Sequence, residues 1–197
     1  LVQAGLRWFA VETHGLLLAD PPSPHGIFGP VVTPAGMAAF ARDPASARQV
    51  WSRQCGYPGD PRYREFHSDL ADDAEWEYLA PYAAGTGARV ATGLKYHRVT
   101  GGDGPKEPYD PDAAGVAVAE HAEHFVRERV RQLGVASKSM ERVPMVVAPY
   151  DAELFGHWWY EGPQFIDAVV RRLAIPGSGI GVLGLGGYLR RHPSNPV

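Results

Sequence analysis

The stretch that decides the fold is P-M-V-V-A-P-Y-D-A-E-L-F-G-H-W-W-Y-E-G-P, residues 144–163. It opens with the apolar run Met-Val-Val-Ala at 145–148, which Pro144 and Pro149 bound on its two sides. A short continuous apolar run between turn signals is typical of a strand that is buried on both faces, as in parallel sheets. We therefore predict a buried strand over 145–148, at the centre of an α/β fold.

Acidic and aromatic side chains follow this predicted strand directly. Asp151 and Glu153 precede the run 155–160, which contains His157, two tryptophans, a phenylalanine and a tyrosine. In parallel α/β folds, ligands bind at the carboxyl edge of the strands. Aromatic faces stack on sugar rings, whereas carboxylates and imidazole bind hydroxyls or transfer protons. The pattern indicates either a site of that kind or a core-facing aromatic patch with a capping Asp, and composition alone leaves both open.

Strand and helix signals alternate along the rest of the chain. The pairs Asp43-Pro44 and Asp110-Pro111 each combine a helix N-cap with a proline at the first helical position. Strands are predicted over 6–11, 37–40, 90–100 and 145–148, and helices over 44–53, 111–134 and 164–173. This alternation favours part of an α/β barrel whose site lies at the carboxyl ends of the strands.

Length and composition are those of one globular domain. The chain has 197 residues, of which 45% are hydrophobic and 21% charged. A net charge of -3 gives no sign of the excess positive charge that binding to nucleic acid or to an anionic membrane requires. The single cysteine excludes an internal disulfide, and no signal peptide or membrane span is visible, so we expect a cytoplasmic protein. The absence of an initiator Met and an end in a loop predict a piece of a longer protein.

The segment Y-D-A-E-L-F-G-H-W-W-Y-E-G-P at 150–163 resembles the fourth signature motif of glycoside hydrolase family 57, in the form of its 1,4-α-glucan branching enzymes. The similarity covers most of 6–172, through V-E-T-H-G-L-L (11–17), W-S-R-Q-C-G-Y-P-G-D-P-R-Y-R-E-F-H (51–67), T-G-L-K-Y-H-R-V-T (92–100) and K-E-P-Y-D-P-D (106–112). The resemblance implies that residues 1–197 are the C-terminal part of a distorted (β/α)7 TIM-like barrel, incomplete at both ends.

The resemblance also implies a retaining enzyme that cleaves an α-1,4 link, holds the chain as a glycosyl-enzyme ester and transfers it to a 6-hydroxyl. Retention needs two carboxyl groups about 5 Å apart. The motif assigns the acid/base to Asp151, whose pKa the neighbouring aromatics are expected to raise by desolvation. Glu153 is the competitor within the sequence. The nucleophilic Glu belongs to an earlier motif that this sequence lacks, so residues 1–197 alone are expected to be inactive.

An α-glucan is the partner that the resemblance implies. Trp158 and Trp159 are expected as stacking platforms, one of them buried, and the loop that carries Tyr57 is expected to border the donor site. The residues predicted to bind substrate are Tyr57, Arg62, Arg64, His14, His157, Trp158 and Trp159. For His14 the alternative is a hydrogen-bonded core histidine, and for the arginines it is a salt-bridged loop. The irregular stretch 19–36 is either a cover of the site or a surface excursion.

Other functions remain as alternatives. An amylase or 4-α-glucanotransferase of the same family is one, and a non-catalytic glucan-binding module that uses Trp158 and Trp159 is another. The run 179–184 matches G-x-G-x-x-G, but too few residues follow it for a dinucleotide fold. His121 and His124 occur as H-A-E-H, which favours a solvated helix face over a zinc site. No metal or cofactor is implied, and the oligomeric state is not predicted.

Overall fold

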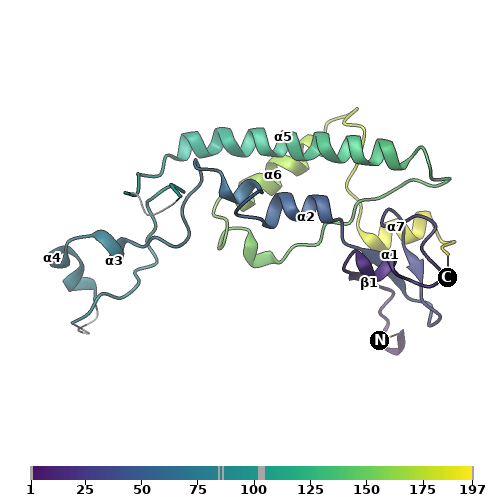
Figure 1. Cartoon of the computed structure of the whole chain (residues 1–197), viewed down its shortest axis with the longest axis horizontal. Coiled ribbons are helices and arrows are strands. Elements are labelled where there is room, and N and C mark those ends of the chain that lie inside the picture. The colour runs from purple at the N-terminus through teal and green to yellow at the C-terminus, as the bar shows by residue number, and fades with distance from the viewer. Residues whose placement is uncertain (1, 84, 86, 102–104, 197) are drawn as a thin grey trace. The chain divides into compact units, whose positions relative to one another are not determined.

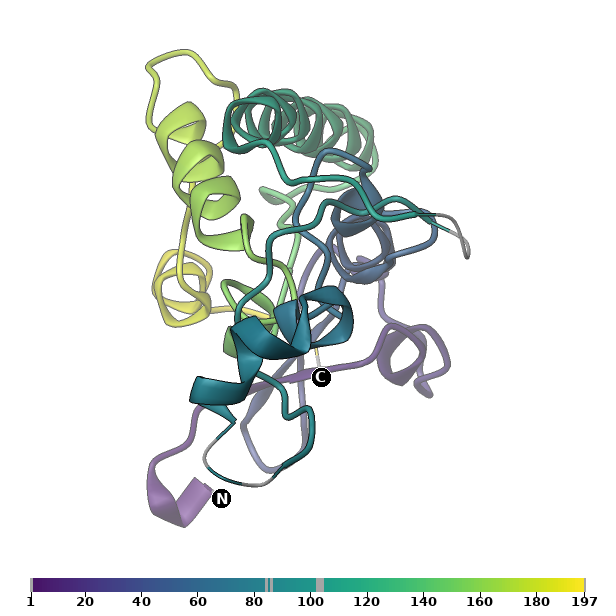
Figure 2. The same cartoon turned by 90° about the vertical axis from the view of Figure 1, so that its left-hand side faces the viewer.

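The structure is a computed structural model, and it describes residues 2–83, 85, 87–101 and 105–196. The chain forms two compact units. Unit 1 comprises Leu1–Val50, Ala122–Tyr150 and Ala168–Val197, and unit 2 comprises Trp51–His121 and Asp151–Asp167. Figures 1 and 2 show the course of the chain, in which the long helix α5 and the helix α6 each contribute residues to both units.

Unit 1 contains a three-stranded sheet of order β1-β3-β2. Strand β1 (Trp8–Val11) pairs in parallel with β3 (Ala38–Ala41), and β2 (Val31–Val32) pairs with β3 in the antiparallel direction. Every residue of the central strand β3 is buried. The predicted strands at 6–11 and 37–40 are therefore confirmed, as is the α/β character of the fold. Three strands do not by themselves establish a barrel.

The predicted central strand over 145–148 is wrong as a strand, although its burial is right. Single backbone hydrogen bonds reach the segment, such as that from the Asp43 N–H to the Val147 carbonyl at 2.8 Å, without forming a ladder among the described residues. The prolines on both sides lack the N–H donors that a ladder needs. Val147 is nevertheless buried in a hydrophobic cluster with Ala38, Phe40 and Tyr188.

The helices begin where their capping residues predict. Helix α2 (Pro44–Trp51) is capped by Asp43, whose Oδ2 accepts a hydrogen bond from the Ser46 N–H at 2.7 Å. Asp110 caps the 26-residue helix α5 (Pro111–Ala136) in the same way, through the N–H groups of Asp112 and Ala113. The remaining helices are α1 (His14–Leu17), α3 (Leu70–Asp73), α4 (Trp76–Leu79), α6 (Gly162–Leu173) and α7 (Leu185–Arg191). Short 3-10 turns are η1 (Val2–Ala4), η2 (Tyr57–Gly59), η3 (Ala80–Tyr82) and η4 (Ala152–Leu154).

The predicted strand over 90–100 is also wrong. The segment makes isolated antiparallel bridges, from Arg98 to Arg64 and from His97 to Pro108. A buried carboxylate explains why no ladder forms, because Asp69 accepts hydrogen bonds from the N–H groups of Thr92 and Gly93, both at 2.9 Å. These donors are then not available to a neighbouring strand.

The core of unit 2 is aromatic. Tyr63, Trp159 and Phe165 are buried, and the Trp159 ring centroid lies 5.4 Å from that of Tyr63 and 4.9 Å from that of Phe165. Tyr57 joins this core at 5.5 Å from Phe165. Since Trp159 belongs to the motif at 150–163, the loop that carries the motif is anchored through this core.

Candidate functional site

Backbone hydrogen bonds connect residues within the loop 151–161, which precedes helix α6. Asp151 precedes η4, and its carbonyl accepts a hydrogen bond from the Leu154 N–H at 3.1 Å. The Trp159 N–H donates to the Leu154 carbonyl, and the Gly156 N–H donates to the Trp159 carbonyl, both at 2.8 Å. Gly156 has a φ of 96°, a backbone conformation that favours glycine. The loop therefore has a defined shape that its own backbone maintains.

The two adjacent tryptophans of this loop have opposite environments. Trp158 is 47% exposed, whereas Trp159 is 2% exposed. The Trp158 ring packs against Phe66 with ring centroids 4.4 Å apart and an interplanar angle of 33°. The expectation that one of the two is buried is confirmed. Trp159 offers no accessible face for stacking on a sugar in this structure, because that face is occupied by the core.

Asp151 and Glu153 are both exposed. The desolvating aromatic environment expected around Asp151 is therefore not formed by the described residues. His157 is exposed as well, and its ring meets Phe66 edge-on at 5.3 Å. The loop thus presents two carboxyl groups, an imidazole and an indole to solvent from one short segment.

Tyr57 and Arg62 both contact other side chains of unit 2. Tyr57 is buried and stacks on His121, with ring centroids 4.5 Å apart. Arg62 binds both carboxylate oxygens of Asp60, at 2.9 and 2.8 Å, and also pairs with Glu120 at 2.8 Å. The Arg62 guanidinium is the main reason why the pKa of Asp60 lies below its usual value. The salt-bridged loop considered as the alternative for Arg62 is what the structure shows.

Arg64 and His14 are the remaining two residues that the sequence predicts to bind substrate. The Arg64 guanidinium lies over the Tyr160 ring, 3.6 Å from its centroid, and the Arg64 N–H donates to Glu161 Oε1 at 3.0 Å. Burial raises the pKa of Glu161 above its usual value. His14 is the first residue of α1 in unit 1 and is exposed, so it is not a core histidine.

A cavity of about 170 Å³ in unit 2 brings two of the predicted residues together. Arg64 and Trp158 line it, with Trp51, Arg53, Pro58, Glu65, Phe66, His67, Val99 and Leu154. Sequence reasoning did not single out Phe66 or Arg53, although both lie within the motif at 51–67. Only the fold shows that Phe66 contacts Trp158, since the two residues are far apart in the sequence.

Glu65 is a buried carboxylate at the wall of this cavity. Its two oxygens accept hydrogen bonds from Arg53 Nη2 at 3.1 and 2.9 Å, and Lys106 lies 3.5 Å away. Burial acts to raise the pKa of Glu65, but the His67 N–H, Arg53 and Lys106 outweigh it, and the pKa lies below its usual value. Glu65 is therefore an ionised, paired group rather than a general acid.

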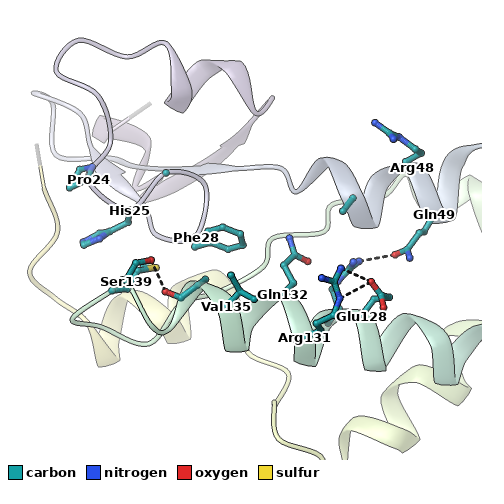
Figure 3. Close-up of a pocket in the computed structure, with 15 residues that line it drawn as sticks. Pro24, His25, Phe28, Arg48, Gln49, Glu128, Arg131, Gln132, Val135 and Ser139 are labelled. Carbon is teal, nitrogen blue, oxygen red and sulfur yellow. Dashed lines mark hydrogen bonds and ion pairs between the residues drawn. The ribbon is translucent and has the colours of Figure 1, made fainter.

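A larger cavity of about 720 Å³ lies in unit 1 and is shown in Figure 3. The irregular stretch 19–36 contributes Pro24, His25 and Phe28 to one side, while α2 and α5 form the other. Arg129 donates to Gln49 at 3.0 Å, and Arg131 pairs with Glu128 at 2.9 Å. The stretch 19–36 thus borders a cavity, but none of the residues predicted to bind substrate is among those that line it.

The structure also shows the surroundings of the two motifs that the sequence does not favour as sites, H-A-E-H and the run 179–184. His121 is not on a solvated face, because its Nδ1 hydrogen-bonds the Tyr63 hydroxyl at 2.7 Å. Within the described residues, no three His, Cys, Asp or Glu side chains are grouped to hold a metal ion. The run 179–184 contains no strand, and Gly184 is the N-cap of α7. In the part of the chain that the structure describes, no helix is long and apolar enough to cross a membrane.

The curated relatives found by comparison with known proteins share one named activity. No family model matches the chain. A probable 1,4-α-glucan branching enzyme of Mycobacterium tuberculosis is 39% identical over 171 residues, which is 84% of this chain and 29% of the relative. The 1,4-α-glucan branching enzyme of Thermococcus kodakarensis is 36% identical over 190 residues, 88% of this chain and 25% of the relative. The chain therefore spans less than a third of the curated relatives that it matches.

Solved structures match over the whole chain. The α-amylase AmyC of Thermotoga maritima is 40% identical with a TM-score of 0.91, covering 100% of this chain and 38% of that one. A GH57-type branching enzyme of Pyrococcus horikoshii is 36% identical with a TM-score of 0.78, covering 100% and 32%. The chain is therefore similar to proteins named as α-glucan-acting enzymes, over a part of their length. The curated relatives reported above are named 1,4-α-glucan branching enzymes, and the resemblance to glycoside hydrolase family 57 is confirmed.

Proposed function

We propose that this chain is a segment of a retaining 1,4-α-glucan branching enzyme, and that it forms the C-terminal part of a distorted (β/α)7 barrel. The observation that carries the proposal is the loop 151–161, which presents Asp151 and Trp158 to solvent while Trp159 anchors it in the core. An exposed carboxyl group and an exposed indole on the same loop match the needs of a glycosidase, namely a proton donor and a stacking surface. The homologous branching enzymes support the same activity.

Asp151 is the acid/base in this proposal. In the first step its carboxylic acid protonates the glycosidic oxygen of the α-1,4 link while a glutamate attacks the anomeric carbon, which forms the glycosyl-enzyme ester and releases the remaining chain. In the second step the Asp151 carboxylate takes the proton of an acceptor 6-hydroxyl, whose oxygen attacks the anomeric carbon and releases the glutamate. One α-1,4 bond is broken and one α-1,6 bond is formed.

The glutamate nucleophile is proposed to come from outside residues 1–197. The acidic residues near the motif have other surroundings: Glu161 is buried and accepts a hydrogen bond from the Arg64 N–H, while Glu12 in unit 1 pairs with Arg42 at 2.9 Å. Glu153, exposed in the same loop as Asp151, is the competing candidate for the acid/base.

An α-amylase or 4-α-glucanotransferase is the second candidate, because the solved structure with the TM-score of 0.91 is an α-amylase. Incubation of the full-length protein with amylose separates the two. A branching enzyme forms α-1,6 links, which a debranching enzyme then releases as short chains, with little gain in reducing ends. An amylase increases reducing ends and leaves nothing for the debranching enzyme to release. A 4-α-glucanotransferase changes the distribution of chain lengths without either product, and a glucan-binding module leaves the amylose unchanged.

A further inference from the structure

The cavity of about 170 Å³ in unit 2 has no role in the mechanism above. It is smaller than the roughly 300–1,000 Å³ of typical small-molecule pockets, so it accepts a group no larger than about one sugar ring. Its lining has two parts. Phe66, Trp158 and Val99 are apolar residues of the lining, while Arg53 and Arg64 are its arginines.

The polar part of the lining supplies donors rather than acceptors. Both oxygens of Glu65 are occupied by Arg53 Nη2, with Lys106 and the His67 N–H beside them. Because Arg53 uses Nη2 for these bonds, its remaining guanidinium N–H groups have no hydrogen-bond partner among the described residues. A ligand with an apolar face and hydroxyl oxygens at its edge matches such a lining.

We infer that this cavity is a subsite that holds a single glucose unit of the α-glucan, with Trp158 and Phe66 against the face of the ring and Arg53 bound to its hydroxyls. The inference rests on the proposed function, which supplies the α-glucan. It extends that function by assigning Phe66 and Arg53 to substrate binding.

Phe66 has a second task as a positioning residue for Trp158. Its ring lies at the centre of a cluster, with Trp158 at 4.4 Å, His157 at 5.3 Å and the Lys95 ammonium at 5.5 Å from its centroid. The backbone next to it is fixed, because the buried Glu65 carboxylate accepts the His67 N–H and the Glu65 N–H donates to the His97 carbonyl. Trp158 is thus supported on one face and exposed on the other.

Binding of maltoheptaose to the full-length protein tests the subsite without turnover when all variants carry Asp151→Asn. Phe66→Ala should weaken binding about threefold to tenfold, the size of a lost aromatic pair. Val99→Phe fills the cavity and should weaken binding by about tenfold or more, since one sugar ring is then excluded. Phe66→Tyr keeps the ring and should bind like the parent. Tyr82→Ala is the matched control, because Tyr82 is an exposed ring that pairs with Tyr78 away from the cavity lining.

Calorimetric titration gives the dissociation constants, and thermal unfolding shows which variants are folded. If folded Phe66→Ala and Val99→Phe both bind maltoheptaose as the parent does, the subsite is wrong. If Val99→Phe does not fold, the comparison of Phe66→Ala with Phe66→Tyr decides alone. In the active protein, Phe66→Ala should raise KM about threefold to tenfold and change kcat less than about twofold, whereas a purely structural loss would lower the amount of active protein and leave KM unchanged.

The outcomes also separate the subsite from the proposed function. Wild-type protein that forms no new α-1,6 links but shows the expected binding pattern overturns the branching activity and supports the subsite. Wild-type protein that branches amylose, with cavity variants that bind normally, overturns the subsite alone.

Discussion

The Arg64 guanidinium lies 3.6 Å from the centroid of the Tyr160 ring, which connects the segment around residue 64 to the end of the motif loop. The Arg64 N–H strengthens the connection by donating to Glu161 Oε1 at 3.0 Å. A cation–π contact of this kind contributes about 0.5–2 kcal/mol. Arg64 is therefore held in place by the protein itself, so that less rotamer entropy is lost when it meets a ligand.

Replacement of Asp151 tests the acid/base assignment. In the full-length protein, Asp151→Asn should lower transfer at least about 10²–10⁴-fold, because the amide can neither donate nor accept the proton. Rates of α-1,6 link formation from amylose give the measurement. Glu153→Gln is the control in the same exposed loop and should retain most activity. If Asp151→Asn stays within a few-fold of wild type and Glu153→Gln does not, the roles are reversed.

The adjacent tryptophans should separate into a binding residue and a core residue. Trp158→Ala removes an exposed stacking face and should weaken glucan use by about 1–3 kcal/mol, seen mainly in KM. Trp159→Ala empties the aromatic core and should lower the free energy of unfolding by about 3–5 kcal/mol. Kinetics and urea unfolding of both variants give the comparison. A Trp158→Ala protein that melts much earlier but has normal kinetics would assign Trp158 to the core as well.

Asp69 should make unit 2 sensitive to acid. Burial acts to raise its pKa, but hydrogen bonds from Ala71, Thr92 and Gly93 lower it from 3.8 to about 2. A carboxyl whose pKa is lower in the folded than in the unfolded state stabilises the fold above the unfolded pKa, so this stability is lost as the pH falls from about 4 to about 2. With solvent screening the contribution is about 1–2 kcal/mol.

Asp69→Asn should therefore unfold more easily than wild type at pH 7, and the difference should shrink towards pH 2. Urea unfolding at a series of pH values measures this. Glu77→Gln, an exposed acid in the same unit, is the control and should change little at any pH. A destabilisation by Asp69→Asn that is equally large at pH 2 and pH 7 would show that the ionised carboxylate is not responsible.

Residues 1–197 expressed alone should not branch amylose, because the proposed nucleophile lies elsewhere in the protein. The purified polypeptide is incubated with amylose, and new α-1,6 links are assayed by debranching-enzyme release against a heat-treated control. Clear branching would place the nucleophile within these residues, with Glu12 and Glu153 as the first candidates for replacement by Gln.

The sequence predicts those parts of the fold that depend on local chemistry. Asp43-Pro44 and Asp110-Pro111 mark their helix starts correctly, because the capping bonds of Asp43 and Asp110 reach residues only two or three positions further along. The strand over 90–100 fails for the opposite reason. Its hydrogen bonds depend on Asp69, a distant carboxylate whose position no local pattern shows.

The candidate site also contains features that the local sequence predicts and features that depend on distant residues. The motif at 150–163 identifies Asp151 and the two tryptophans, yet neighbouring identical residues give no signal of which one is buried. Phe66 reaches Trp158 only through the folded chain. Arg62 and Arg64 are also alike in sequence, and only the structure separates an arginine in ion pairs with Asp60 and Glu120 from one that lines a cavity.

Gly162, the first residue of α6, is a position at which the protein should not tolerate a missense change. A Cβ at this position would stand 2.8 Å from the Phe155 Cα, a backbone atom that cannot turn aside. Any base change that replaces this glycine adds a side chain or a stop, so every such missense change brings an atom into that contact. Missense changes at this codon are therefore expected to disturb the packing of the start of α6 against Phe155, although Gly162 itself carries no group that takes part in chemistry.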